Sequence, residues 1–356
     1  MALPYQRPGL SMSRQTENDP ALVRALQRDL RALGYLRSGI DGNYGGGTVQ
    51  AIRALQYDLL HNRGASRADD GRAPVAITDF NAIPPGADQP AVTAVTGVLD
   101  QATAECIRQL LDDDRIATVP DAMNSAAENQ KAVAAIAAAQ STVAPTPFIS
   151  AIVLQESNGQ HFRVPTPRDE DNFVVVGLDH GNSAAPDAIT SRGYGIGQYT
   201  LFHHPPRPEE VKDFILDPVR NVQRAYAGLR NKFDQFIVGP TSRADDRSAE
   251  HPLLPLRVCR YPPSDRRYMR DCRNCAAAVG KVTITPGQLA YPGAPFGYAP
   301  DQYYPTALYH GVPNRAEFLC DWPYAVRRYN GSGNDSFHYQ TRILLNLLSL
   351  DPPARS

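Results

Sequence analysis

Glu156 stands near the end of an apolar segment, where a carboxyl group can act as an acid or a base. Residues 147–159 (PFISAIVLQESNG) place apolar side chains at helical spacing and predict a buried helix, with apolar positions Phe148, Ile149, Ile152, Val153 and Leu154. Asn158 and Gly159 favour a helix stop, because both residue types adopt the left-handed C-cap conformation. Partial desolvation there raises the pKa of Glu156, as a general acid requires. A solvated Glu at a helix end is the simpler alternative.

Further short motifs follow in the chain. Glycines at positions 193, 195 and 197 let the backbone pass close to a ligand or a packed helix. The Lys-Ser/Thr pair of a phosphate loop does not follow them. Asp217-Pro218 predicts a capped helix with proline in its first turn. Residues 324–333 end a further helix, and His338-Tyr339 opens the last one.

In this order the motifs resemble those of soluble lytic transglycosylases, which share the α-helical lysozyme-like fold. The family patterns are Glu-Ser, Gly-Leu-Met-Gln, Asp-Pro-x-x-Asn and Ala-Tyr-Asn-Ala-Gly followed by a Tyr. The matching residues are Glu156-Ser157, Gly195-Ile196-Gly197-Gln198, Asp217-Pro218 with Asn221, and Arg328-Tyr329-Asn330-Gly331-Ser332-Gly333 with Tyr339. Each motif is weak alone, and four in the right order are strong together. The resemblance covers residues 146–237 and 321–350.

The resemblance implies that Glu156 cleaves the β-1,4 bond between N-acetylmuramic acid and N-acetylglucosamine in peptidoglycan. Glu156 would protonate the glycosidic oxygen and then, as a base, draw the proton from the muramyl 6-hydroxyl as a 1,6-anhydro ring closes. Tyr329 would orient Glu156 as the other catalytic residue, and no cofactor is required. The implied substrate-binding residues are Ser157, Gly195, Ile196, Gln198, Tyr199, Asn330 and Tyr339. Core packing is the alternative for Tyr329 and Tyr339.

Two departures from the family leave the reaction outcome open. Gly197 stands where the family has Met, and a long acidic segment, residues 160–192, separates Glu156 from the glycines. Goose-type lysozymes, of the same fold, resemble this arrangement, since they place Asp residues in the corresponding loop and hydrolyse with water. Asp169, Asp179 and Asp187 are therefore candidates for a second carboxylate. The alternative is a solvated acidic loop.

The N-terminal part predicts three helices joined by similar turns. Asn18-Asp19-Pro20 starts the first helix, Thr48 is expected to cap the second, and residues 97–103 lead into the third. The pattern resembles the three-helix peptidoglycan-binding domain of cell-wall hydrolases. The matching residues are Leu26-Gln27, Leu30, Leu33-Gly34-Tyr35, Asp41-Gly42-Asn43-Tyr44-Gly45, Thr48, Ala51-Ile52, Leu55-Gln56, Gly97, Asp100 and Thr103. The resemblance implies wall binding through Asp41, Tyr44 and Thr48. The family lacks residues 61–94, which we expect to form a surface loop; a plain helical bundle is the alternative.

Four of the five cysteines gather in one region. Cys259, Cys272, Cys275 and Cys320 lie within or next to an insertion, residues 239–320, between two of the catalytic motifs. We favour disulfides that staple this loop-rich segment, with a structural zinc site as the weaker alternative, because a single CxxC with irregular outer spacings is a poor zinc signal. No other metal site is expected.

Composition limits the partners. At 356 residues with a net charge of −1, the chain lacks the basic excess typical of nucleic-acid binding, and it has no apolar run long enough to insert into a bilayer. Residues 1–19 form a polar tail without the apolar core of a signal peptide, so we expect holin-type release or a dedicated secretion system to bring the chain to the periplasm or cell wall.

The predicted fold is mainly α, with three parts after the polar tail. They are a peptidoglycan-binding domain (20–114), an Ala-rich helical linker (115–145) and a lysozyme-like catalytic domain (146–350) that carries the insertion. The predicted protein is a lytic transglycosylase, either a phage endolysin or a secreted antibacterial effector with an immunity partner, and its substrate is the glycan strand. The alternatives are a hydrolytic muramidase and a non-catalytic wall-binding protein.

Overall fold

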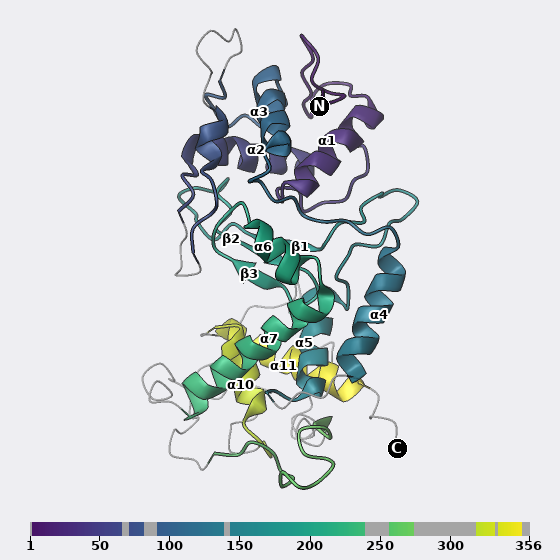
Figure 1. The fold of residues 1–356 in the computed structure, drawn as a ribbon, viewed down its shortest axis with the longest axis vertical. Coiled ribbons are helices and arrows are strands. Elements are labelled where there is room, and N and C mark those ends of the chain that lie inside the picture. The colour runs from purple at the N-terminus through teal and green to yellow at the C-terminus, as the bar shows by residue number, and fades with distance from the viewer. Residues whose placement is uncertain are drawn as a thin grey trace. The chain divides into compact units, whose positions relative to one another are not determined.

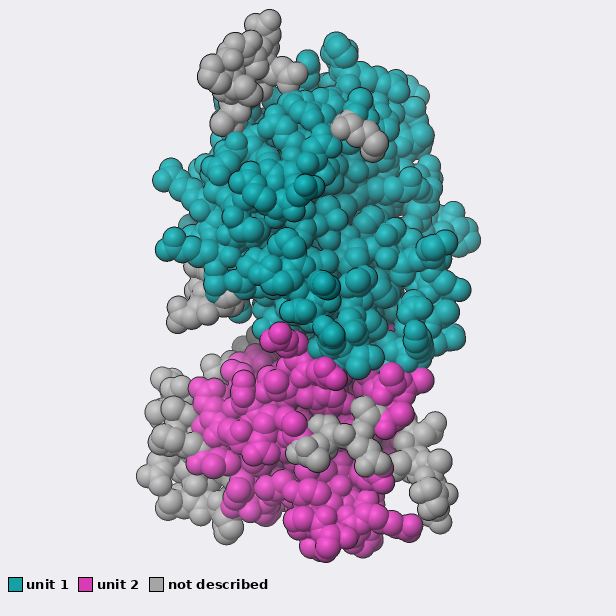
Figure 2. Space-filling model, in the orientation of Figure 1, with its two compact units in different colours: residues 1–132, 160–221 teal, residues 133–159, 222–356 magenta. Residues whose placement is uncertain are grey.

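The computed structural model describes residues 2–65, 71–81, 91–138, 143–238, 256–273, 318–331 and 334–350, and it confirms a mainly α fold (Figure 1). The chain forms two compact units, each described by itself (Figure 2). Unit 1 comprises residues 1–132 and 160–221, and unit 2 comprises residues 133–159 and 222–356. This division differs from the predicted one, because residues 160–221 share a unit with the N-terminal module rather than with Glu156. In the described part of the chain, every helix is too short or too polar to cross a membrane.

Three helices form the N-terminal module of unit 1. They are α1 (Pro20–Ala32), α2 (Gly46–His61) and α3 (Gln101–Asp112). As predicted, Asp19 caps α1 by accepting a hydrogen bond from Ala21 N at 2.8 Å. The prediction for Thr48 is wrong, since α2 begins at Gly46 with Gly45 as its N-cap. The backbone of the glycine run can enter the helix without a side-chain cap, so Thr48 lies inside the first turn.

Two glutamines close this module in the same way. Gln27 Nε2 donates to Thr48 Oγ1 at 3.0 Å, and Gln56 Nε2 donates to Thr103 Oγ1 at 3.1 Å. Both glutamines are 1% exposed. Each Oε1 accepts a hydrogen bond from a turn glycine, Gly42 N at 2.8 Å and Gly97 N at 2.9 Å. The sequence repeat predicted from the turns and threonines is therefore also a repeat of hydrogen bonds. In each copy, a buried glutamine amide finds the partners that a buried polar group needs.

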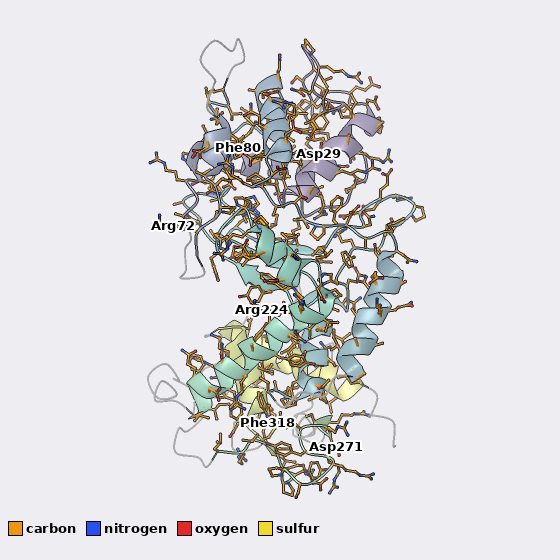
Figure 3. The ribbon with its side chains drawn as sticks, viewed as in Figure 1. Asp29, Arg72, Phe80, Arg224, Asp271 and Phe318 are labelled. Carbon is orange, nitrogen blue, oxygen red and sulfur yellow. The ribbon has the colours of Figure 1, made fainter. Side chains whose placement is uncertain are left out.

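The expected surface loop at residues 61–94 is partly core. Its described part contains the 3-10 helix η1 (Ile77–Asn81), which packs against α2. Ile77 and Phe80 are 1% and 7% exposed, and Phe80 is labelled in Figure 3. The polar composition of the segment concealed these few apolar anchors, because a short helix needs only one or two of them.

A three-stranded antiparallel sheet replaces part of the predicted loop at 160–192. Strands β1 (Val176–Asp179), β2 (Ser191–Tyr194) and β3 (Tyr199–Leu201) lie in that order. Val174 and Val176 are buried in its core, in keeping with the preference of β-branched residues for strands. The short helix α6 (Pro208–Glu210) continues as the π-helical turn η2 (Val211–Ile215), whose Phe214 and Ile215 join the same core.

Buried charges join the module to residues 160–221 within unit 1. Arg31 Nη2 lies 2.5 Å from Asp171 Oδ2, and both side chains are 0% exposed. Arg192 Nε donates to Gly34 O at 3.0 Å, and its guanidinium carbon lies 5.0 Å from the centre of the Tyr35 ring. Because a buried charge is costly without its partner, the module and the sheet stabilise each other.

The Ala-rich segment forms helix α4 (Ser125–Ala138). At its unit 1 end, the buried Asn129 side chain donates to Phe162 O at 2.7 Å and accepts from His161 N at 2.8 Å. This part of the predicted linker is therefore packed, and not a free spacer.

Unit 2 contains α5 (Thr146–Ser157), α10 (Trp322–Tyr329), α11 (Asn334–Ser349) and most of α7 (Pro218–Phe233), which continues as η3 (Asp234–Val238). Both α5 and α10 pack against α11. Phe148, Ile149, Ile152 and Val153 are buried as predicted, whereas Leu154 is 36% exposed because it lies on the outer face of α5. The last helix begins at Asn334, ahead of the predicted His338.

Most of the insertion lies outside the described residues, and so does Cys275. Cys272 and Cys320 are buried. Cys259 Sγ accepts a hydrogen bond from Met269 N at 3.4 Å. Asp321 N donates a hydrogen bond to Arg257 O at 2.6 Å, and Arg257 N donates one to Asp321 Oδ2, also at 2.6 Å. The disulfide and zinc alternatives both stay predictions.

Candidate functional site

Glu156 lies on the last turn of α5, where the predicted cap forms. Asn158 adopts a left-handed conformation (φ 53°), and its N–H bonds to Leu154 O at 3.2 Å. Glu156 is partly buried, and Tyr339 from α11 donates its hydroxyl hydrogen to Glu156 Oε1 at 2.6 Å. Asn346 Nδ2, also on α11, donates to Ala151 O at 3.2 Å. Two contacts from one helix therefore position the carboxyl group.

Burial raises the pKa of Glu156, and the hydrogen bond from Tyr339 lowers it in part. Burial also raises the pKa of Tyr339 well above its usual value, and the neighbouring Glu156 adds to the rise. Tyr339 thus stays a hydrogen-bond donor, while Glu156 keeps its proton to a higher pH than a solvated Glu. This combination suits a general acid.

We expect Tyr339→Phe to shift the alkaline limb of the pH–activity profile to higher pH. The ionised carboxylate of Glu156 loses the hydrogen bond that lowers its pKa, so ionisation of the acid needs a higher pH. The profile of kcat/KM against pH measures this. Tyr268→Phe, on a half-buried tyrosine of the insertion, serves as the control. An unchanged or lowered alkaline limb would contradict the assignment.

The residue predicted to orient Glu156 was Tyr329, and the structure gives that contact to Tyr339. Tyr329 is half-buried at the end of α10, with Cε2 3.1 Å from the position that a Cβ would take at Gly228. It contributes to the raised pKa of Tyr339. Asn330 is exposed, and Ser157 Oγ donates to Val153 O of its own helix at 3.1 Å. Two tyrosines in the same motif region could not be told apart by spacing alone.

In unit 1, Asn221 holds the Gly195–Gln198 turn. Its Oδ1 accepts from Gly197 N at 2.7 Å, and its Nδ2 donates to Tyr194 O at 2.9 Å and Phe214 O at 3.2 Å. The side chain is 0% exposed. As predicted, Asp217 starts α7, with Oδ1 accepting from Val219 N at 2.9 Å. The Asp-Pro-x-x-Asn motif therefore both starts a helix and fastens the glycine turn.

His161 supports the same turn, and sequence reasoning missed it. Its Nδ1 accepts from Ile196 N at 3.2 Å, and its Nε2 lies 2.8 Å from Ile215 O, so the ring is neutral with its proton on Nε2. A Cβ at Gly195 would lie 2.5 Å from the ring, and Gly195 has φ 68°, which together explain the glycine. A lone histidine in a polar segment offers no pattern that would reveal this role.

Low pH should destabilise the protein through His161. Burial lowers the pKa of its ring to about 4 from an ordinary 6.5. Between these values the unfolded chain binds a proton that the folded chain excludes, so stability is full above pH 6.5 and falls as the pH drops toward 4. The shift corresponds to about 3 kcal/mol.

Urea unfolding at pH 7 and pH 4.5 measures this loss. We expect the drop between the two pH values to be smaller by about 2 kcal/mol in His161→Gln than in the native chain. His180→Gln, on an exposed histidine, should keep the native drop. Equal drops in the native chain and His161→Gln would contradict the assignment.

Gln198 is folded onto the sheet. Its backbone has φ 47°, and Nε2 donates to Gly195 O at 2.7 Å. Its Oε1 would lie 2.4 Å from a Cβ at Gly177 and 2.9 Å from one at Gly193. Tyr199 packs its ring 4.6 Å from that of Phe214. Gly195, Ile196 and Gln198 thus belong to one turn, with Gly195 and Ile196 buried, and Tyr199 opens the strand β3 that follows it.

The three candidate second carboxylates all lie in unit 1, whereas Glu156 belongs to unit 2. Asp169 accepts from Ile40 N at 2.8 Å. Partial burial raises its pKa, but the backbone hydrogen bonds and Arg163 together outweigh burial and hold the pKa below the usual value. Asp187 pairs with Arg53 through two bonds of 2.7 Å. Asp179 is exposed and accepts from Thr190 Oγ1 at 3.2 Å. Asp169 and Asp187 therefore have structural partners within unit 1.

The predicted wall-binding residues differ in exposure. Asp41 is exposed, whereas Tyr44 and Thr48 are 3% and 1% exposed. Tyr44 donates its hydroxyl to Gly97 O at 3.0 Å and accepts from Leu99 N at 3.1 Å. Burial leaves Tyr44 and Thr48 too little surface to contact a glycan strand. Tyr44 instead bonds to the backbone of Gly97 and Leu99, and Thr48 belongs to the repeat of buried hydrogen bonds described above. Within the described ranges, no cluster of three or more His, Cys, Asp or Glu side chains could hold a metal ion.

Comparison with known proteins finds a match in the N-terminal module. Residues 19–59, from the cap of α1 to the last turns of α2, match the family model described as "Putative peptidoglycan binding domain". No curated protein and no solved structure matches the chain. The chain therefore contains a peptidoglycan-binding domain, and peptidoglycan is supported as its binding partner.

Proposed function

We propose that the protein cleaves the β-1,4 bond between N-acetylmuramic acid and N-acetylglucosamine in peptidoglycan, as a lytic transglycosylase with Glu156 as its single acid and base. The observation that carries this proposal is the pair formed by Glu156 and Tyr339. A partly buried carboxyl group with a raised pKa lies 2.6 Å from a tyrosine hydroxyl. The same chain carries a peptidoglycan-binding domain.

Glu156 would first give its proton to the glycosidic oxygen, so that the N-acetylglucosamine hydroxyl leaves. The resulting carboxylate, stabilised by the Tyr339 hydroxyl, would then take the proton of the muramyl 6-hydroxyl while that oxygen attacks the anomeric carbon. The proton returns to Glu156, so no second carboxylate is consumed or required. Gly195, Ile196 and Gln198 of the glycine turn, Tyr199 at the start of β3, and Asn330 would contribute saccharide contacts.

A hydrolytic muramidase is the second candidate function, and the surroundings of Asp179 favour it. Asp179 is exposed, and among the described residues it has no ion pair, unlike Asp169 and Asp187. If water is the acceptor in place of the 6-hydroxyl, Asp179 is the residue best able to activate it.

Mass spectrometry of muropeptides released from purified sacculi tests the proposal. Products ending in 1,6-anhydro-muramic acid, lighter by one water than hydrolytic products, support the transglycosylase. Reducing-end products would favour the muramidase, with Asp179→Asn as the next variant. Binding to sacculi with no released product would leave a non-catalytic wall-binding protein.

The place of action follows from this substrate. Peptidoglycan lies outside the cytoplasmic membrane, so an endolysin would reach it by holin-type release and an antibacterial effector by a dedicated secretion system. An effector would also come with an immunity protein that blocks the Glu156 site in the producing cell.

A further inference from the structure

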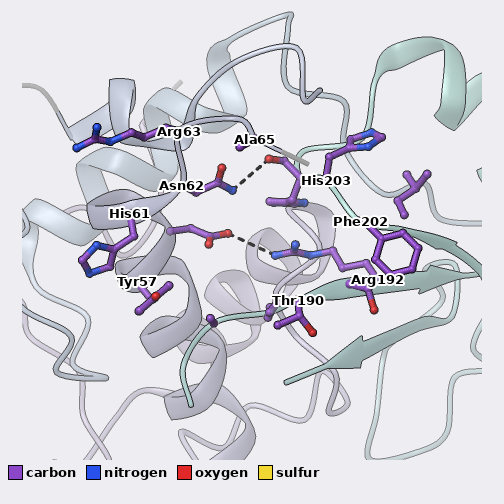
Figure 4. Close-up of a pocket in the computed structure, with 15 residues that line it drawn as sticks. Tyr57, His61, Asn62, Arg63, Ala65, Thr190, Arg192, Phe202 and His203 are labelled. Carbon is purple, nitrogen blue, oxygen red and sulfur yellow. Dashed lines mark hydrogen bonds and ion pairs between the residues drawn. The ribbon is translucent and has the colours of Figure 1, made fainter. Parts of the chain in front are cut away.

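A pocket of about 300 Å³ lies within unit 1, between the C-terminal end of α2 and the strands β2 and β3 (Figure 4). Tyr57 and Asn62 line it from the helix side, and Thr190, Arg192 and Phe202 line it from the sheet side. Its volume falls at the small end of the range for ligand pockets. None of the residues predicted to bind substrate or wall lines it.

An ion pair with spare hydrogen-bonding capacity forms the polar part of this pocket. Arg192 Nη2 lies 3.5 Å from Asp58 Oδ2, as the dashed line in Figure 4 marks. Asp58 also accepts from the Tyr35 hydroxyl at 2.8 Å. Arg192 is 3% exposed, and among the described residues its Nη2 has only the long 3.5 Å contact with Asp58, which leaves its hydrogen-bonding capacity incompletely used. A buried donor in that state favours a ligand with an acceptor atom.

The charges of the pocket balance. The positive Arg192 faces the negative Asp58, and burial together with Arg192 keeps the pKa of His204 well below its usual value, so that His204 is neutral. In Figure 4, the side chains of His61 and Arg63 point away from the ion pair. A ligand carboxylate beside Arg192 would also meet the carboxylate of Asp58. The site therefore suits a neutral ligand better than an anion.

Apolar and hydroxyl groups complete the walls. Phe202 lines the pocket and is 41% exposed, so it offers aromatic surface there. Tyr57 lies against His61 with ring centres 4.5 Å apart. Thr190 Oγ1 uses its hydrogen for Asp179 and keeps a lone pair as an acceptor. Aromatic surface next to hydroxyl, amide and guanidinium groups is the environment that a sugar ring with an amide substituent requires.

We propose that this pocket binds a 2-acetamido sugar of the glycan strand, apart from the Glu156 site. The acetamido carbonyl accepts a hydrogen bond from Arg192, the methyl group packs on Phe202, and ring hydroxyls donate to Thr190 and Asn62. The proposal rests on the peptidoglycan association in the proposed function and not on its catalytic step. Because walls come from both α2 and the sheet, the site exists only where the module and residues 160–221 are packed together.

Amide chemical-shift mapping by transverse-relaxation-optimised NMR tests this. The full chain carrying Glu156→Gln, which should leave oligomers uncut, is titrated with the β-1,4 tetramer of N-acetylglucosamine and separately with cellotetraose, which lacks the acetamido group. We expect the acetylated tetramer to shift the amides of Asn62, Ser191 and Phe202, and cellotetraose to leave them in place. Shifts of the Gln155 and Ser157 amides, on either side of the substituted position, report the proposed cleavage site separately, so the two proposals fail independently.

Two matched variants test how the pocket contributes to affinity for the acetylated tetramer. Phe202→Ala should raise the Kd for the acetylated tetramer, read from the Asn62 and Ser191 amides, at least tenfold. Met123→Ala, which removes another exposed apolar side chain of unit 1, should leave it unchanged. Equal shifts from both tetramers, no shift at these amides, or shifts produced only by a carboxylate-bearing stem peptide would overturn the proposal.

Discussion

Glu156→Gln is expected to lower the rate of glycan cleavage by about 10²–10⁴-fold, the usual contribution of a general acid. The amide keeps the shape of the side chain and still accepts the hydrogen bond from Tyr339, but it has no proton to give. The rate of soluble muropeptide release from sacculi measures the effect. Glu17→Gln, on an exposed glutamate, provides the control and should retain the full rate.

The thermal stability of Glu156→Gln should distinguish a loss of catalysis from misfolding of the variant. The pKa of Glu156 is raised in the folded chain, so its contribution to stability is full below the unfolded pKa and is lost as the pH rises through the folded pKa. An uncharged Gln removes that loss, and the Tm of Glu156→Gln at pH 8 should equal or exceed that of the native chain. Lysis at the native rate by this variant would mean that another residue is the acid.

Asn221→Ala should destabilise the protein by about 3–5 kcal/mol, at the upper end of single substitutions. The change leaves Gly197 N without its 2.7 Å acceptor, and Tyr194 O and Phe214 O lose their shared donor. These groups are buried in the core of unit 1, where an unpaired polar group costs about 1–3 kcal/mol. The free energy of unfolding in urea measures the effect.

A second asparagine of the same unit provides the comparison for Asn221. Asn172 Nδ2 makes one bond, to Ala122 O at 2.8 Å, in a partly exposed position. Asn172→Ala should therefore cost about 1 kcal/mol. Equal losses in the two variants would show that the glycine turn does not depend on Asn221.

Within unit 1, the binding domain packs directly against residues 160–221. A tethered module would only raise the local concentration of the polymer. Here Arg31 pairs with Asp171 at 0% exposure, and Phe173 and Ile189 pack against the core of the module. The binding domain and the glycine turn thus belong to one compact unit and are not joined by a flexible tether.

Local sequence determined the features that depend on neighbours in the chain. The spacing of Phe148, Ile149, Ile152 and Val153 specified the buried side of α5, and Asn158 specified its end. Asp19 and Asp217 specified two helix starts. These features rest on backbone geometry and on hydrogen bonds within a few residues, which short motifs report directly. The repeated turns likewise pointed to the peptidoglycan-binding domain that the family model matches.

Only the tertiary structure decided the contacts between distant segments. Tyr339 donates a hydrogen bond to Glu156, His161 supports a turn more than thirty residues away, and Arg31 pairs with Asp171. Each choice depends on which faces of separate elements meet, and on the need for every buried charge or polar group to find a partner. A single sequence shows which residues could pair, whereas packing determines which of them do.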